Sequence, residues 1–396
     1  MKTKMWQGVL WAAALSACTD QTPLAPQPTA AAGNGVSASA GTGSVAVPSA
    51  GTGSLPAAGG GGTGNPVGAS AGSSAAGRPA PADPDLDDAG SGETPVGNPN
   101  VGGPAPVSGE VALTTDLVIP AGSTMTVGPG ATFKASPDVK VQVLGELIVK
   151  GSSESPAVFA GGGMPRSWHG IVVEAGGKLT LEHAQISGAT YGLFIMPGAE
   201  FSVDSSVIDT SFKAAVVQSN GSFTRTRFVA TVPETVSLAS EVTVDDPNGA
   251  LTIMDASPTI TDCRFDGASA LTDLVRIGGN ASPTFDHVYL HDAHCAFHTF
   301  GGTNTSARIT HARIENFPYG FMAYTTKPIV EDSVFINNGA DFGICLGATE
   351  DNAPALRNNF YSGGEVLLDA SCFGLGINDP SPAGADDPSI GTVSKF

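Results

Sequence analysis

Beyond about residue 109, apolar residues recur in short alternating runs separated by Gly, Pro, Asn and Asp. No long stretch shows the 3.6-residue period of an amphipathic helix, whereas such alternation is typical of half-buried strands. Many of the runs share the form apolar-x-x-x-x-apolar. They are LEHAQI from Leu181, VDSSVI from Val203, FTRTRF from Phe223, ITDCRF from Ile260, FDHVYL from Phe285, ITHARI from Ile309, VEDSVF from Val330 and LRNNFY from Leu356.

Successive runs start 22, 20, 37, 25, 24, 21 and 26 residues apart, and the longest interval contains the insertion VATVPETVSLASEVTVDDPNGA. A period of this size, with short strands in each unit, predicts a solenoid, because one unit cannot bury its apolar side alone. Equivalent strands of stacked units should lie about 4.8 Å apart. The side chains expected in the shared core are Leu181, Ile186, Ile260, Phe265, Phe285, Leu290, Ile309, Ile314, Val330 and Phe335.

Several units are similar to a known repeat. LEHAQISGATYGLFI and VEDSVFINNGADFGICL resemble the repeats of right-handed parallel β-helix proteins, the pectin-lyase-like fold. Upstream, LVIPAGSTMTVGPGATFKA, LGELIVKGSSESPAVFAG and SWHGIVVEAGGKLTL resemble the first rungs of bacterial secreted β-helix proteins. The resemblance covers about residues 112–370 and implies an all-β, right-handed parallel β-helix solenoid. A β-sandwich is the alternative.

The chain begins with MKTKMWQGVLWAAALSAC. Lys2 and Lys4 precede an apolar run over residues 5–14, which is shorter than the roughly 20 residues of a membrane-spanning helix. This pattern predicts a secretory signal. LSAC resembles the lipobox of bacterial lipoproteins, which implies cleavage before Cys18 and anchoring in the lipid bilayer through the acylated cysteine. Thr19 follows instead of Asp, so the resemblance favours the outer membrane; an ordinary cleaved signal is the alternative.

A second compositional segment covers residues 19–108. It consists mostly of Ala, Gly, Ser, Pro and Thr and contains no aromatic residue. Such a segment cannot bury enough apolar surface to offset its ordering entropy, so it predicts a disordered tether with an r.m.s. span of about 50 Å. The predicted organisation is a signal over residues 1–18, this tether, a β-helix domain over residues 109–376 and a C-terminal tail over residues 377–396.

The predicted folded part, from residue 109 onward, carries 15 Lys and Arg against 31 Asp and Glu, a net charge of −16. Such acidity argues against nucleic acid as a partner, because nucleic acids select basic stripes. It also argues against electrostatic binding to anionic lipids or anionic polymers. The acidity suits divalent cations, or simply the solubility of a surface protein.

The stretch HVYLHDAHCAFH, residues 287–298, holds four of the seven histidines. In the repeat register these four scatter around one rung, so a helical HxxxH metal motif is not available. The register instead stacks Asp262, His287, His311 and Asp332 on successive rungs. Two adjacent imidazoles could share a divalent metal ion. A solvated turn ladder and a pH-sensitive patch are the alternatives, and no other cofactor is predicted.

A second polar column, Asp266, His291 and Glu315, follows the second apolar anchor of each unit. The simplest interpretation is again a set of solvated turn residues, since a zinc site normally needs four supported ligands. His298 lies on a later strand of its unit. Its place between the inward-facing Phe297 and Thr299 predicts that it points outward, beside Met322 and Cys345.

Four cysteines remain after Cys18. Cys345 and Cys372 fall in adjacent rungs near the C-terminal end, where a solenoid needs a cap, so they are the predicted disulfide. Cys263 aligns with Val288 and Ala312, which predicts a small, partly buried residue that stays a thiol.

Many members of the resembling fold act on polysaccharides, but their catalytic patterns are not found in this sequence. Asp245-Asp246 is not followed by Gly-His-Gly. Trp168 in WHG is interpreted as a packing residue. Arg264 and Arg276 qualify as catalytic bases by residue type alone. No cluster of calcium-binding aspartates lies beside them in the sequence. Fold by itself does not imply function.

The sequence therefore favours a lipid-anchored protein of the outer membrane or cell surface whose β-helix is a non-catalytic recognition or adhesion module, for carbohydrate or a surface protein. A polysaccharide-active lyase or hydrolase is the alternative, and a structural envelope protein is the second alternative. An enzyme should gather carboxylates and a basic residue in one strip across three or four rungs. A binder should instead expose aromatic residues there, such as Tyr289, Tyr319 and Tyr324.

Overall fold

The computed structural model describes residues 105–393, except 165, 231–248, 268–271, 301–304, 324–325, 346–348, 350 and 352. The predicted signal, Cys18 and the predicted tether up to residue 104 lie outside the described residues. No helix within the described ranges is long and apolar enough to cross a membrane.

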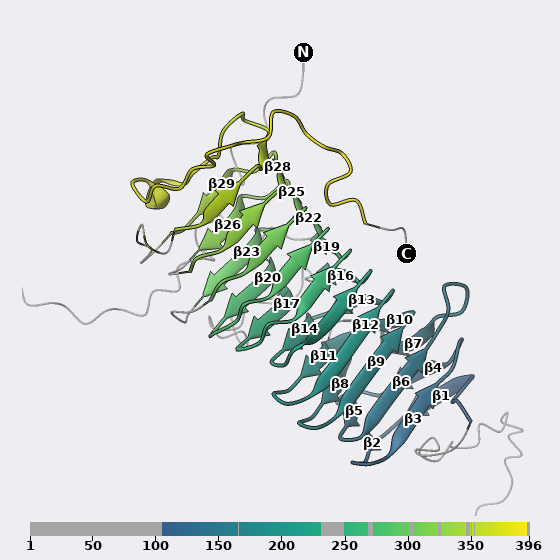
Figure 1. The fold of residues 1–396 in the computed structure, drawn as a ribbon. Coiled ribbons are helices and arrows are strands. Elements are labelled where there is room, and N and C mark those ends of the chain that lie inside the picture. The colour runs from purple at the N-terminus through teal and green to yellow at the C-terminus, as the bar shows by residue number, and fades with distance from the viewer. Residues whose placement is uncertain are drawn as a thin grey trace, which may run out of the picture. The chain divides into compact units, whose positions relative to one another are not determined.

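The described chain winds into a solenoid in which successive rungs add strands to three parallel sheets (Figure 1). Within the described residues, sheet I has 11 strands, and sheets II and III have 10 each. Sheet I contains β1 (Glu110–Leu113), β4 (Thr132–Ala135), β7 (Ala157–Ala160), β10 (Ala184–Ser187), β13 (Val207–Ser211), β16 (Arg227–Ala230), β19 (Arg264–Gly267), β22 (Tyr289–His291), β25 (Arg313–Glu315), β28 (Val334–Ile336) and β31 (Phe360–Tyr361).

The other two sheets are built from the strands that follow in each rung. Sheet II contains β2 (Leu117–Ile119), β5 (Lys140–Val143), β8 (Trp168–Val173), β11 (Ala189–Ile195), β14 (Lys213–Val217), β17 (Gly249–Met254), β20 (Asp273–Gly278), β23 (Cys295–Phe300), β26 (Tyr319–Ala323) and β29 (Ala340–Gly343). Sheet III contains β3 (Thr124–Val127), β6 (Glu146–Lys150), β9 (Lys178–Glu182), β12 (Glu200–Asp204), β15 (Gly221–Thr224), β18 (Thr259–Thr261), β21 (Thr284–Asp286), β24 (Arg308–Thr310), β27 (Ile329–Glu331) and β30 (Ala355–Arg357).

This architecture confirms the predicted parallel β-helix. Neighbouring strands in each sheet pair in parallel, as β1 does with β4 and β2 with β5. The β-sandwich alternative, which requires antiparallel sheets, is wrong. A right-handed coil is the sense that the twist of parallel strands favours.

One core runs along the axis between the three sheets. All ten side chains expected in this core are at most 1% exposed. Aromatic rings stack from rung to rung inside it: the centroids of Phe228 and Phe265 lie 4.8 Å apart, and Phe297 and Phe321 continue the pattern at 5.5 Å. Each aromatic contact of this kind adds about 0.5–1.5 kcal/mol beyond its area burial. The rungs are therefore held in register by their interior.

A single residue turns the chain from sheet III into sheet I in the later rungs. This residue has a φ near +50°, the left-handed region that Asn, Asp and His tolerate best among non-glycine residues. The column consists of His183, Ser205, Arg225, Asp262, His287, His311, Asp332 and Asn358. These are the third positions of the eight repeat units, so the register read from the sequence is confirmed.

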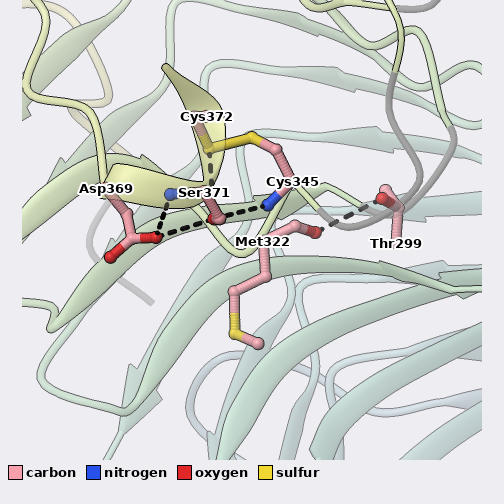
Figure 2. Close-up of a disulfide and its surroundings, with 6 residues drawn as sticks. All are labelled: Thr299, Met322, Cys345, Asp369, Ser371 and Cys372. Carbon is pink, nitrogen blue, oxygen red and sulfur yellow. Dashed lines mark hydrogen bonds between the residues drawn. A yellow bond between two sulfur atoms is a disulfide. The ribbon is translucent and has the colours of Figure 1, made fainter. Parts of the chain in front are cut away.

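The C-terminal end of the solenoid is closed by a covalent staple. Cys345 and Cys372 form a disulfide, with their Cα atoms 5.0 Å apart. Figure 2 shows Ser371 beside it, accepting a hydrogen bond from the Cys345 amide at 3.1 Å and donating to Asp369 at 2.7 Å. Cys372 ends the short 3₁₀ helix η2 (Ala370–Cys372), which follows the last rungs. The staple thus fixes this helix against the end of the core.

The chain after η2 folds back along the solenoid. Asp379 accepts hydrogen bonds from the backbone amides of Asn358 and Asn359, at 3.2 and 2.8 Å. Farther on, Asp386 accepts two hydrogen bonds from the guanidinium of Arg313 in β25, at 3.1 and 3.2 Å. This returning segment therefore lies over the turn column and the outer side of sheet I.

Candidate functional site

Two histidines of the turn column face one another on adjacent rungs. The rings of His287 and His311 stack with their centroids 4.4 Å apart. The Nδ1 atoms of both rings approach the carboxylate of Asp286, at 3.0 Å for His287 and 2.8 Å for His311. Thr310 donates a further hydrogen bond to this carboxylate at 2.8 Å. Partial burial raises the pKa of Asp286, but the hydrogen bonds from His311, His287 and Thr310 outweigh it and hold the pKa below its usual range.

The predicted quartet is thus only partly assembled. His287, His311 and Asp332 line one cavity of about 330 Å³, which the returning C-terminal segment helps to enclose. Asp332 accepts a hydrogen bond from Asn358 at 2.6 Å. Asp262 is not among the described residues that line this cavity. The carboxylate between the two imidazoles is instead Asp286, the last residue of β21.

A larger groove, of about 710 Å³, opens over the turn column and the outer side of sheet I. Arg225 of the turn column, Arg227 of β16 and Arg264 of β19 all line it. Their side chains are 42%, 42% and 36% exposed, so the guanidinium groups are accessible to a ligand. Within the described chain, no acidic side chain lines this groove, although the folded part is strongly acidic overall.

Two carboxylates that are not among the described groove lining hold the three arginines. Arg225 is paired with Asp204. Asp266 binds the Nε atoms of Arg227 and Arg264 and the Nε2 atom of His291, the last at 2.6 Å.

Asp266 is 6% exposed, so its interpretation as a solvated turn residue is wrong. Although burial raises its pKa, the hydrogen bonds from His291, Arg264 and Arg227 lower it well below the usual range. The hydrogen bond that His291 donates to Asp266 in turn raises the pKa of His291.

A separate charged cluster lies on the outer side of sheet II. Asp273 of β20 binds the Nδ1 atoms of His294, at 3.1 Å, and His298, at 2.6 Å. The Nε atom of Arg276 lies 3.8 Å from the same carboxylate. His298 pairs with Met322 in the register of sheet II, as predicted, but the next residue in this row is Gly343 and not the predicted Cys345.

Burial dominates the electrostatics of this cluster. Asp273 and His294 are 7% and 5% exposed. Burial raises the pKa of Asp273, but the hydrogen bonds from His294 and His298 outweigh it, so the carboxylate ionises well below its usual range. On the same sheet, burial and the charge of Arg276 lower the pKa of Lys213 to about 8. The cluster therefore concentrates ionisable groups in a place that water hardly reaches.

Trp168 and Cys263 lie within the described residues, whereas two other candidate positions do not. Asp245-Asp246 and Tyr324 lie outside the described residues. Trp168 is 1% exposed and donates from Nε1 to the carbonyl of Ser187 at 2.8 Å, which confirms a packing role. Cys263 is fully buried rather than partly buried, and it is a free thiol whose pKa burial raises to about 12.

The sequence predicts neither the groove nor the network at Asp273, and it places Asp266 and His291 in one column without their arginine partners. Arg264 and Arg276 were singled out by residue type alone, and Asp273 was not singled out. One signal was available: Arg227 and Arg264 occupy the same position in successive units, immediately before the second apolar anchor.

A comparison with protein-family models gives no match, and neither do comparisons with curated proteins and with solved structures.

Proposed function

We propose that the β-helix is a non-catalytic recognition module that binds a short stretch of acidic carbohydrate in the arginine-lined groove. The observation that carries this proposal is the segregation of charge. Three arginines from neighbouring rungs converge on a groove without an acidic side chain among its described lining, in a chain with 18 basic and 37 acidic residues.

The charge balance of the groove favours an anion. Three guanidinium groups are paired with two carboxylates, Asp204 and Asp266, and neither carboxylate is among the described residues that line the groove. Arginine forms planar, two-pronged hydrogen bonds with carboxylates, so uronate groups suit this surface. The net charge of the domain still repels a long polyanion, which is why a short acidic segment fits better than nucleic acid.

An aromatic surface lies next to the arginines. Tyr289 pairs with Arg264 in the register of sheet I, and the Arg264 guanidinium lies 5.2 Å from the centre of its ring. The Tyr289 hydroxyl donates to Glu315, which fixes the ring orientation. An oriented, half-buried ring beside cations is a suitable platform for the apolar face of a sugar.

The test is isothermal titration calorimetry of the full chain with oligouronates and with neutral oligosaccharides of equal length. Only the oligouronates should bind, and their affinity should fall as salt rises. Arg227→Gln and Arg264→Gln should each weaken binding about tenfold, the order expected for one charge-assisted hydrogen bond.

Arg308→Gln is the matched control. Arg308 lies on sheet III, away from the groove lining, and is half exposed and paired with Glu331. Its replacement should leave affinity unchanged. Equal binding of neutral sugars, or an equal loss with Arg308→Gln, would contradict the proposal.

The proposal includes a membrane-anchored location at the outer membrane or cell surface. It rests on the sequence of residues 1–18, where Cys18 stands at the predicted cleavage site. Expression in a Gram-negative host should attach labelled palmitate to the chain. Cys18→Ala should abolish labelling and release the protein from the membrane fraction.

A polysaccharide-active lyase or hydrolase is the second candidate, and a different observation favours it. The Asp273 carboxylate lies 2.6 Å from Nδ1 of His298, and an imidazole oriented by a carboxylate is a common general base. Arg276 and Lys213 place cations on the same face of sheet II. This gathering of a carboxylate and basic groups on neighbouring rungs is the arrangement expected of an enzyme.

One assay distinguishes the recognition module from the enzyme. Incubation with an acidic polysaccharide should give binding without new reducing ends or unsaturated products if the domain only recognises its ligand. Product release that disappears in His298→Ala but persists in Arg227→Gln would establish the enzyme instead. Neither binding nor release would favour the structural envelope role.

A further inference from the structure

We propose that Asp286, His287 and His311 form a binding site for a divalent transition-metal ion of the zinc type. This inference does not depend on the proposed function, because none of the three residues lines the arginine groove. It rests on the convergence of two imidazoles and one carboxylate and on the cavity beside them.

The backbone holds the two histidines in place. His287 and His311 both occupy the left-handed turn, with φ of 52° and 51°. Their strands β21 and β24 are paired in register, so the two side chains leave the solenoid one rung apart in the same direction. Little rearrangement of the backbone is therefore needed to bring both rings to one ion.

The ligand atoms are close enough for one ion. One ligand atom from each of Asp286, His287 and His311 can be chosen so that all three lie within 4.8 Å of one another. The Asp286 carboxylate accepts from both Nδ1 atoms and from the Thr310 hydroxyl. When a metal binds at Nδ1, each imidazole proton moves to Nε2, and the carboxylate turns from hydrogen-bond acceptor to ligand. Thr310 continues to orient that carboxylate, as groups next to metal ligands commonly do.

The types of ligand, two imidazoles and one carboxylate, determine which ion this site prefers. Neutral imidazole nitrogens suit zinc, copper and nickel, whereas calcium and magnesium require mainly oxygen ligands. Two histidines and one carboxylate leave further coordination positions open. The cavity of about 330 Å³ beside the two histidines has room for water at these positions. Asp332 in its wall adds negative charge that favours a cation.

The experiment is a titration of the full chain with Zn²⁺, followed by calorimetry, with Ca²⁺ as a competitor. The parent should bind one Zn²⁺ ion that excess Ca²⁺ does not displace. His287→Asn and His311→Asn should each weaken Zn²⁺ binding at least about tenfold. Asparagine is chosen because Asn358 already occupies the same turn with a φ of 54°, so the variants keep the local fold.

His183→Asn is the matched control, since His183 occupies the same turn position, with a φ of 50°, but is not part of the three-residue group. This variant should bind Zn²⁺ as the parent does. Asp286→Asn should also weaken binding, because an amide oxygen is a poorer ligand than a carboxylate. No Zn²⁺ binding by the parent, or equal affinities in the parent, His287→Asn and His311→Asn, would overturn the proposal. An equal loss in His183→Asn would do the same.

Discussion

Asp266 and Asp273 are two buried carboxylates on adjoining faces of the same rung, and each is held by histidine and arginine. Their partners differ in exposure. Around Asp266, the side chains of Arg227 and Arg264 are 42% and 36% exposed. Around Asp273, those of Arg276 and His298 are 8% and 14% exposed. One network opens to solvent and the other is enclosed.

The comparison shows why similar ion pairs favour different roles. An exposed guanidinium can exchange a protein carboxylate for a ligand carboxylate at little cost, because water stabilises it during the exchange. An enclosed pair cannot exchange in this way, since each separated charge would remain desolvated. We therefore associate the Asp266 network with recognition and the Asp273 network with stability or with chemistry inside a closed site.

The largest expected effect is the loss of stability when the enclosed Asp273 network is disrupted. Asp273→Ala removes the carboxylate that His294 and His298 share, so buried polar groups lose their charged partner. The free energy of unfolding should fall by about 3–5 kcal/mol. Chemical denaturation followed by circular dichroism measures it. A loss similar to that of an exposed ion pair would show that the cluster is more hydrated than its burial implies.

The corresponding change on the open side should have a smaller effect. In Asp266→Ala, the half-exposed Arg227 and Arg264 can turn towards water, and mainly His291 stays confined. We expect a loss of about 1–3 kcal/mol in the same denaturation experiment. If both alanine variants lose equal stability, the distinction between the two networks fails.

The Asp266 and Asp273 networks should also differ in their effect on ligand binding. Asp266→Asn removes one negative charge that is paired with two groove arginines, so oligouronate affinity should rise severalfold, which is worth about 1 kcal/mol. Asp273→Asn should leave the affinity unchanged, because its carboxylate lies on sheet II. Calorimetry of both variants against the parent decides the point. A rise in both variants would indicate a long-range effect of net charge instead.

The smallest expected effect is on pH dependence. Both carboxylates have folded-state pKa values below the unfolded value of about 3.9, so their stabilisation is present above that pH. It is lost as the pH falls further, through the folded-state pKa values. Asn variants should lose less stability than the parent between pH 5 and 2, and each variant should differ from the parent by on the order of 1 kcal/mol. Denaturation midpoints across this range test the prediction, and identical profiles in parent and variants would contradict it.

Much of the fold was predictable because it depends on local rules. Alternation of apolar residues placed Phe265 and Phe285 in the core, and both are fully buried. The third position of each unit became the left-handed turn, since short polar residues such as Asp262 and Asn358 tolerate a positive φ.

The sites were less predictable, because they depend on contacts between rungs. His287 and His311 were aligned by the repeat, but the carboxylate between them is Asp286 and neither of the aspartates in the same column. Arg227 and Asp266 are paired although 39 residues separate them. Such a partner follows from the direction in which each side chain leaves its strand, and alignment of the repeat does not give that direction.

Alternation and spacing of residues within a unit therefore predicted the solenoid, its register, its core and its polar turn positions, and the resemblance to known repeats predicted the parallel β-helix. Which charges are buried and which are open became clear from the packed rungs alone. Net charge is a property of composition, whereas the gathering of three arginines in one groove, with their carboxylate partners outside its described lining, depends on the stacking of rungs. Burial of Asp266 and Asp273 requires neighbouring rungs to cover them, and that covering exists only in the folded chain.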